Sequence, residues 1–266
     1  MCGLVGIVGA RADRDAVMRM AAAVAHRGPD DEAVWTDAGV ALAHRRLSII
    51  DLSPAGRQPM LSHDGRYRLI FNGEIFNYRE LGDAMPGVSW RSSSDSEILL
   101  ELFARRGPAC LDDLVGMFAI AIWDTAERRL FCARDRLGIK PFYYVKLGDG
   151  WAFGSEIGAL LAAGAPAVAN EPILYDFLAR DFYEHTDATF FRGVHQLPPG
   201  HWMWLAESET PAPRRYWDLA AEAAKLAPPK ERVARAEELL ARMQDSVRLA
   251  LRSDVPVGIT LSGGLD

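Results

Sequence analysis

The chain has 266 residues, of which 49% are hydrophobic and 25% are charged, a composition that can bury a substantial core and is not that of a disordered segment. Its net charge of −6 gives no electrostatic basis for binding nucleic acid or an anionic membrane. The three cysteines are too few and too widely spaced for a disulfide framework or a zinc site, which favours a reducing, cytoplasmic setting.

The first two thirds of the chain alternate short apolar segments with two amphipathic helices, a pattern typical of sheets covered by helices. A first group of strands is predicted at 4–8, 32–35, 40–43, 47–50 and 68–71. A second group is predicted at 117–123, 130–133, 142–145 and 151–153. The run 117–123 is far too short to cross a bilayer, and the N-terminus lacks the basic and apolar regions of an export signal, so we expect neither insertion nor export.

Two helices are predicted from apolar residues at helical spacing that follow a capping aspartate. Asp13 can cap a helix with one apolar face, formed by Ala16, Val17, Met20, Ala21 and Val24. Asp95 can cap another, with Ile98, Leu99, Leu102 and Phe103 on its apolar face. Both helices should therefore lie against a sheet, which gives a layered sandwich.

The composition changes to proline, alanine and charge between 211 and 229, which indicates a linker. A long amphipathic helix is predicted at 231–252, followed by a buried strand at 257–261 and then Ser-Gly-Gly-Leu-Asp at 262–266. A hydroxyl and two glycines after a strand suit a loop that binds a pyrophosphate. A Gly-Gly turn explains the same pattern.

Cys2 is the first candidate catalytic residue. Removal of Met1 would leave a thiol and a free α-amine on one residue, and an α-amine with a pKa near 8 can accept the thiol proton without a histidine. The alternative is that Cys2 is a small apolar residue at the start of a buried strand.

The sequence Asn72-Gly73-Glu74 follows the predicted strand at 68–71 and suits an acyl-transfer site. An asparagine amide and a glycine N–H could both stabilise the oxyanion that forms when a thiolate attacks a carboxamide. The alternative is a tight turn, since Asn-Gly is a common hairpin sequence.

A free amino acid carries a carboxylate and an ammonium group, and its recognition needs at least one arginine and one or two acids. Arg46, Glu74 and Asp95 supply these groups. Arginine can bind a carboxylate through two hydrogen bonds, and the two acids can bind an ammonium group. Taken singly, Arg46 could equally be a surface cation and Asp95 a helix cap.

Seven short blocks occur in order along the chain: Cys2-Gly3, His-Arg-Gly-Pro-Asp at 26–30, Arg-Leu-Ser-Ile-Ile-Asp at 46–51, Asn-Gly-Glu-Ile at 72–75, Ser-Asp at 94–95, Arg-Asp-Arg-Leu-Gly-Ile-Lys-Pro at 134–141 and Ser-Gly-Gly-Leu-Asp at 262–266. Together they resemble the glutamine-dependent asparagine synthetase family. The resemblance implies an α+β fold, a four-layer αββα sandwich of the N-terminal-nucleophile type, followed by the start of an α/β ATP-pyrophosphatase domain. It also implies a glutaminase domain at 2–210, a linker at 211–230 and the beginning of a synthetase domain at 231–266.

The resemblance further implies roles for individual residues. The catalytic residues would be Cys2, Asn72 and Gly73. The glutamine pocket would comprise Arg46, Leu47, Ile49, Ile50, Glu74 and Asp95. The ATP site would begin with Leu261, Ser262, Gly263, Gly264 and Asp266. No metal ligand is expected in this chain.

The implied reaction is hydrolysis of glutamine to glutamate and ammonia, with the ammonia amidating an aspartate adenylate made from ATP and Mg²⁺ in the second domain. The glutaminase half would need no cofactor. Two alternatives remain open: an amidotransferase that uses another carboxylate acceptor, on a natural product or a surface sugar, and a non-catalytic regulatory module that retains Met1. The expected partners are small molecules, with a homodimer as a possible assembly.

Overall fold

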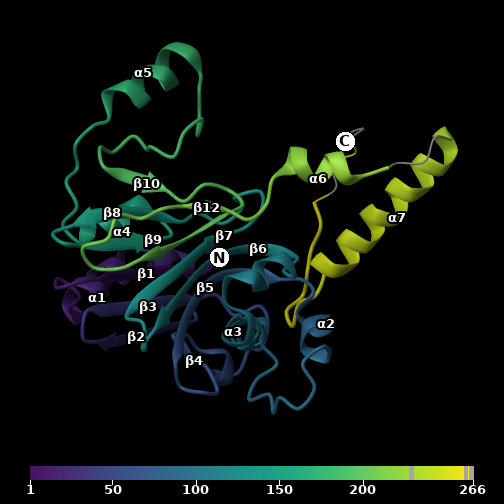
Figure 1. Cartoon of the computed structure of the whole chain (residues 1–266), viewed down its shortest axis with the longest axis horizontal. Coiled ribbons are helices and arrows are strands. Elements are labelled where there is room, and N and C mark those ends of the chain that lie inside the picture. The colour runs from purple at the N-terminus through teal and green to yellow at the C-terminus, as the bar shows by residue number, and fades with distance from the viewer. Residues whose placement is uncertain (228–230, 261–262, 264–266) are drawn as a thin grey trace.

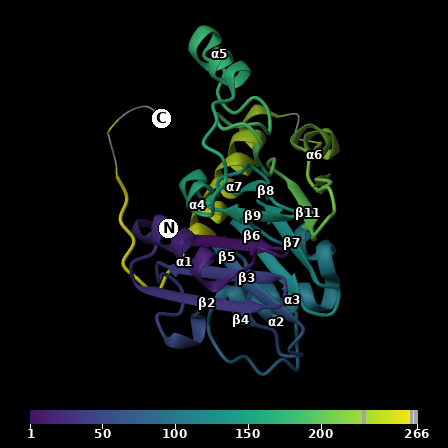
Figure 2. The same cartoon turned by 90° about the vertical axis from the view of Figure 1, so that its left-hand side faces the viewer.

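The computed structural model describes residues 1–227, 231–260 and 263. Two six-stranded antiparallel sheets pack face to face, and helices cover both outer faces (Figures 1 and 2). This is the four-layer αββα sandwich predicted from the sequence, so the α+β fold class is confirmed. No helix in the described part of the chain is long and apolar enough to cross a membrane.

The first sheet has the strand order β10-β8-β9-β1-β3-β2. Its strands are β1 (Gly3–Val8), β2 (Asp31–Asp37), β3 (Val40–Arg46), β8 (Tyr143–Leu147), β9 (Gly150–Gly154) and β10 (Val194–Gln196). The second sheet has the order β12-β11-β7-β6-β5-β4. Its strands are β4 (Met60–Leu61), β5 (Tyr67–Ile75), β6 (Gly116–Asp124), β7 (Arg129–Arg134), β11 (His201–Leu205) and β12 (Arg214–Arg215).

Three apolar clusters join the layers, because each strand alternates its side chains between two buried faces. The central cluster fills the space between the sheets and includes Leu4, Leu42, Ile70, Trp123 and Phe153. The second lies under α1 (Arg14–Ala23) and α4 (Ile157–Ala162). The third lies between β5 and α3 (Asp95–Arg106).

The remaining helices lie at the periphery. They are α2 (Tyr78–Asp83), α5 (Glu171–Arg180), α6 (Leu219–Lys225) and α7 (Arg232–Ala250). None of the residues of α5, α6 or α7 is buried. The helix α7 was predicted from the sequence, whereas α2, α4, α5 and α6 were not.

Both helices that were predicted to follow a capping aspartate are present. The Asp13 carboxylate caps α1 by accepting a hydrogen bond of 2.7 Å from the Ala16 amide, as predicted. The predicted cap of α3 is wrong by one residue: Ser94 is the N-cap, and its hydroxyl accepts from the Ser96 amide. Asp95 is the first residue of the helix, and this frees its carboxylate for another contact.

The strand predicted at 47–50 is not formed, because β3 ends at Arg46. The amides that would continue the ladder donate to side chains instead: Leu47 to the Cys2 sulfur and Ser48 to Asp30. Residues 47–50 are therefore an irregular loop. The chain then turns so that the carbonyls of Ile50, Asp51 and Ser53 contact the Arg46 guanidinium.

The Asn72-Gly73-Glu74 segment lies inside β5 rather than at a strand end or in a turn. These residues pair with Ala119, Phe118 and Met117 of β6. The backbones approach so closely there that a Cβ on Gly73 would lie 2.2 Å from the Met117 carbonyl oxygen. The sequence prediction failed because Asn and Gly have low strand propensity, which the pairing with β6 overrides.

The buried strand predicted at 257–261 is also wrong for the residues that the structure describes. Residues 257–260 have no strand partner in the described chain, and Val257 and Ile259 are 53% and 75% exposed. An apolar run becomes a buried strand only beside other strands, and none of the described strands lies next to it.

Candidate active site

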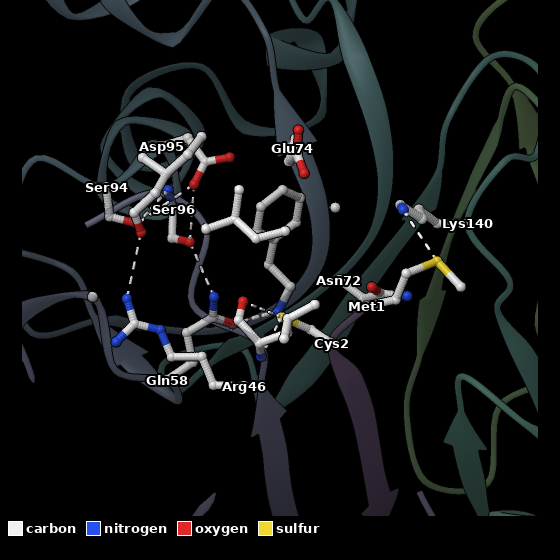
Figure 3. A pocket seen from close by; sticks show the side chains of 16 residues that line it. Met1, Cys2, Arg46, Gln58, Asn72, Glu74, Ser94, Asp95, Ser96 and Lys140 are labelled. Atoms are coloured by element: carbon white, nitrogen blue, oxygen red, sulfur yellow. Dashed lines mark hydrogen bonds between the residues drawn. The ribbon is translucent and has the colours of Figure 1, made fainter. Parts of the chain in front are cut away.

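One pocket brings together the N-terminus, the end of β3, the middle of β5 and the start of α3 (Figure 3). All nine residues predicted for catalysis and glutamine binding line it: Cys2, Arg46, Leu47, Ile49, Ile50, Asn72, Gly73, Glu74 and Asp95. The structure thus gathers the predicted set in one place. The individual roles stay predictions.

The Cys2 sulfur lies against the backbone of Leu47. It accepts a hydrogen bond of 3.4 Å from the Leu47 amide and donates one of 3.6 Å to the Leu47 carbonyl oxygen. Burial raises the pKa of the Cys2 thiol, so the neutral thiol is the resting form. A thiolate therefore requires a base beside it.

Arg27 fixes the backbone of Cys2. Its Nε donates to the Cys2 carbonyl oxygen at 2.9 Å, and its Nη1 donates to Glu156 at 2.9 Å. Burial lowers the pKa of the terminal ammonium, here on Met1, which favours a free amine near neutral pH. Arg27 belongs to the block at 26–30, for which the sequence predicted no role.

Arg46 is buried, and the loop after β3 orients its guanidinium. Nη1 donates to the Ser53 carbonyl at 2.9 Å, and Nη2 donates to the carbonyls of Ile50, at 3.4 Å, and Asp51. Gly56 packs so closely that a Cβ there would lie 2.2 Å from Nη2. A guanidinium has five N–H donors, so donors remain for a ligand carboxylate in the pocket.

Asp95 and Glu74 supply the acidic side of the pocket. Asp95 is 4% exposed, and its Oδ2 accepts a hydrogen bond of 2.9 Å from the Ile75 amide. Burial raises the pKa of Asp95 to about 6 and also raises the pKa of Glu74. A buried carboxylate at neutral pH favours a bound cation, which suits the ammonium group of an amino acid.

Asn72 is 1% exposed, and its Nδ2 has no hydrogen-bond partner among the described residues. A buried donor without a partner is rare and costs about 1–3 kcal/mol, so it calls for an explanation. Because Asn72 lines the same pocket as Cys2, a ligand oxygen is the natural acceptor.

Gln58 and Lys140 also line the pocket, and the sequence predicted no role for either. Gln58 connects two walls, since its Oε1 accepts from the Phe71 amide at 2.6 Å and its Nε2 donates to the Ser96 hydroxyl at 3.0 Å. Lys140 is buried at the opposite end from Asp95 and donates to the Met1 sulfur at 3.4 Å (Figure 3). The one sequence signal for Lys140 is its place in the block at 134–141.

Four residues of the predicted ATP loop lie outside the described part of the chain: Leu261, Ser262, Gly264 and Asp266. Gly263 is described, and its φ of 73° lies in the left-handed region that favours glycine.

Comparison with known proteins first defines the class. Residues 1–217 match the family model of the glutamine amidotransferase domain, and residues 238–266 match the model of asparagine synthase. The chain therefore belongs to the glutamine amidotransferase domain family. The resemblance to glutamine-dependent asparagine synthetases, inferred from the seven sequence blocks, is confirmed.

Individual relatives agree. The chain is 37% identical to glutamine-hydrolysing asparagine synthetase 2 of Bacillus subtilis, over 100% of this chain and 37% of the relative. It is 36% identical to amidase chry2 of Gibberella zeae, over 91% of this chain and 36% of the relative. The chain thus spans well under half the length of these relatives.

A solved structure supports the fold. The glutamine phosphoribosylpyrophosphate amidotransferase of Bacillus subtilis, complexed with ADP and GMP, superposes with a TM-score of 0.61 at 20% identity. The match covers 81% of this chain and 49% of that one.

Proposed function

We propose that this chain hydrolyses L-glutamine to glutamate and ammonia. The observation that carries the proposal is the joint placement of Cys2, a buried arginine, a buried carboxylate and an asparagine amide that has no partner among the described residues, all in one pocket. Each group has a counterpart on glutamine. Arg46 would bind the α-carboxylate, Asp95 and Glu74 the α-ammonium, and Cys2 the side-chain amide.

The mechanism starts with the free amine of Cys2 after removal of Met1. The amine accepts the thiol proton, and the sulfur attacks the side-chain carbonyl carbon of glutamine. The oxyanion accepts hydrogen bonds from the Asn72 amide and the Gly73 N–H. When it collapses, the C–N bond breaks, and the α-ammonium of Cys2 donates its proton to the leaving nitrogen, which departs as ammonia. Water then hydrolyses the γ-glutamyl thioester, releasing glutamate and restoring the thiol.

The fate of the ammonia belongs to the same proposal. We infer that residues 2–210 form the glutaminase domain, 211–230 a linker and 231–266 the start of a second domain that uses ATP and Mg²⁺ to adenylate aspartate. The names of the asparagine synthetase relatives support aspartate as the acceptor, and the amidase relative keeps another carboxylate acceptor as the alternative. A cytoplasmic location and a homodimer remain predictions.

Retention of Met1 should abolish the activity, because the nitrogen of Cys2 is then a peptide nitrogen and cannot act as a base. We expect ammonia release from L-glutamine to be proportional to the fraction of chains that lack Met1, as measured by intact mass. Treating the retained fraction with methionine aminopeptidase should raise the rate to match. Full turnover by chains that retain Met1 would contradict the mechanism, because the nitrogen of Cys2 could not then be the base.

Glutamine binding should weaken below about pH 6. The pKa of Asp95 is raised to about 6, so the group is ionised and binds an ammonium above that pH and is neutral below it. Calorimetry with Cys2→Ala should show Kd for L-glutamine rising about tenfold per pH unit below pH 6 and a plateau above pH 7. In the Cys2→Ala, Asp95→Asn double variant, Kd should be high throughout. A Kd that is independent of pH in Cys2→Ala would exclude Asp95 as the ammonium ligand.

A further inference from the structure

A short segment after α7, residues 252–254, contacts the loop that follows β3 and the chain that follows β5, although it lies far from both in the sequence. Figure 1 shows the chain turning back beside α2 after α7. Arg252 contacts the chain after β5, and Asp254 contacts the loop after β3. Neither residue lines the pocket, and the proposed hydrolysis does not use them.

Asp254 binds the backbone on both sides of Ile50, which lines the pocket. Its amide donates to the Ile49 carbonyl at 2.9 Å, and its Oδ2 accepts from the Asp51 amide at 2.7 Å. Two hydrogen bonds, one before and one after the same residue, fix the loop at that point.

The loop that Asp254 holds is the one that orients Arg46. The carbonyls of Ile50, Asp51 and Ser53 accept hydrogen bonds from the Arg46 guanidinium. Asp51 has a φ of 54°, in the left-handed region that non-glycine residues rarely adopt. Such a conformation persists only where surrounding contacts impose it, and the Asp254 carboxylate supplies one of them.

Arg252 contacts the chain that follows β5. Its Nη1 donates to the Phe76 carbonyl at 2.6 Å, directly after β5, the strand that carries Asn72. Both Nη atoms also donate to the Glu80 carboxylate at 2.5 Å, and this pairing lowers the pKa of Glu80 to about 2. The Arg252 side chain is only 11% exposed.

We propose that Arg252 and Asp254 are positioning residues of the glutamine pocket, which set the affinity for glutamine by connecting the loop that orients Arg46 to the end of the strand that carries Asn72. The inference rests on the proposed function, which supplies the ligand. Because the same segment leads directly into the predicted nucleotide loop, it makes glutamine affinity depend on the chain that begins the second domain.

Equilibrium binding of L-glutamine to chains that carry Cys2→Ala tests the proposal without turnover. Adding Asp254→Ala should raise Kd about tenfold, a loss of about 1.4 kcal/mol. Adding Asp254→Asn should change Kd by less than about twofold, because the asparagine Oδ1 still accepts from the Asp51 amide. Arg252→Ala should resemble Asp254→Ala. Arg242→Ala is the matched control, because in the part of the chain that the structure describes Arg242 pairs with Glu238 on α7 and with no residue of the pocket.

Kinetics in chains with Cys2 intact provide the second measurement. At temperatures well below the Tm of each variant, Asp254→Ala and Arg252→Ala should raise KM and leave kcat near the wild-type value, which separates positioning from loss of folded protein. Equal Kd values for the parent and Asp254→Ala, or equal losses in Asp254→Ala and Asp254→Asn, would overturn the proposal. A wild-type chain that binds glutamine without hydrolysing it would refute the proposed function and leave these binding results valid.

Discussion

Replacement of Cys2 by alanine should reduce kcat for glutamine hydrolysis by on the order of 10⁴-fold or more, the scale seen when a covalent nucleophile is removed. The variant retains every other group that lines the pocket, so it should still bind glutamine. Ammonia release measured with glutamate dehydrogenase gives the rate, and calorimetry gives the binding. Loss of turnover with retained binding is the signature of a missing nucleophile.

The chain supplies its own control for this experiment. Cys132 is fully buried in β7 and lies outside the pocket, and burial raises its thiol pKa well above the usual value. The Cys132→Ala variant should therefore keep wild-type turnover. Undiminished ammonia release by Cys2→Ala would remove the basis of the proposed mechanism, whatever the control shows.

Replacement of Asn72 by alanine should lower kcat by about 10²–10³-fold with little change in KM. The reason is that the Asn72 Nδ2 has no partner among the described residues in the resting state, so its hydrogen bond is available for the transition state. For the same reason the substitution should not weaken the fold through loss of a hydrogen bond. Steady-state kinetics and thermal unfolding measure the two effects.

Asn77 gives the opposite pattern and serves as the comparison. Its Nδ2 donates to the Asp113 carbonyl at 2.9 Å, and its Oδ1 accepts from the Val115 amide at 3.0 Å. Asn77→Ala should lower the free energy of unfolding by about 1–3 kcal/mol and leave kcat unchanged. If Asn72→Ala behaves like Asn77→Ala, with lost stability and intact kcat, Asn72 has a structural role and does not stabilise an oxyanion.

The sequence predicted the layers of the fold because their causes are local. Short apolar or alternating segments marked most strands of both sheets, and helical spacing after Asp13 and Asp95 marked α1 and α3. It could not predict where β3 ends or β5 continues, since both depend on partners distant in the chain. Leu47 leaves the sheet because its amide bonds to Cys2, and Gly73 stays in it because β6 lies alongside.

The candidate site divides in the same way. Cys2, Arg46, Asn72 and Asp95 could be predicted because each is a nucleophilic, charged or hydrogen-bonding residue in a short, recognisable block. Supporting residues such as Gln58 could not, because nothing local distinguishes a glutamine that contacts Ser96 from one on the surface. The contact between Asp51 and Asp254 joins residues separated by 203 positions, and only the folded chain brings them together.

The uninterrupted pairing of β5 with β6 also bears on how long a side chain the pocket accepts. Asn72 and Glu74 are two residues apart on one strand, so their spacing is set at roughly 7 Å by backbone geometry rather than by adjustable loops. In the proposed binding mode, an amino acid whose ammonium lies at Glu74 and Asp95 must have a side chain long enough to reach Asn72. A carboxamide one methylene shorter would not reach Asn72 in that binding mode, so we expect the chain to bind glutamine more tightly than asparagine.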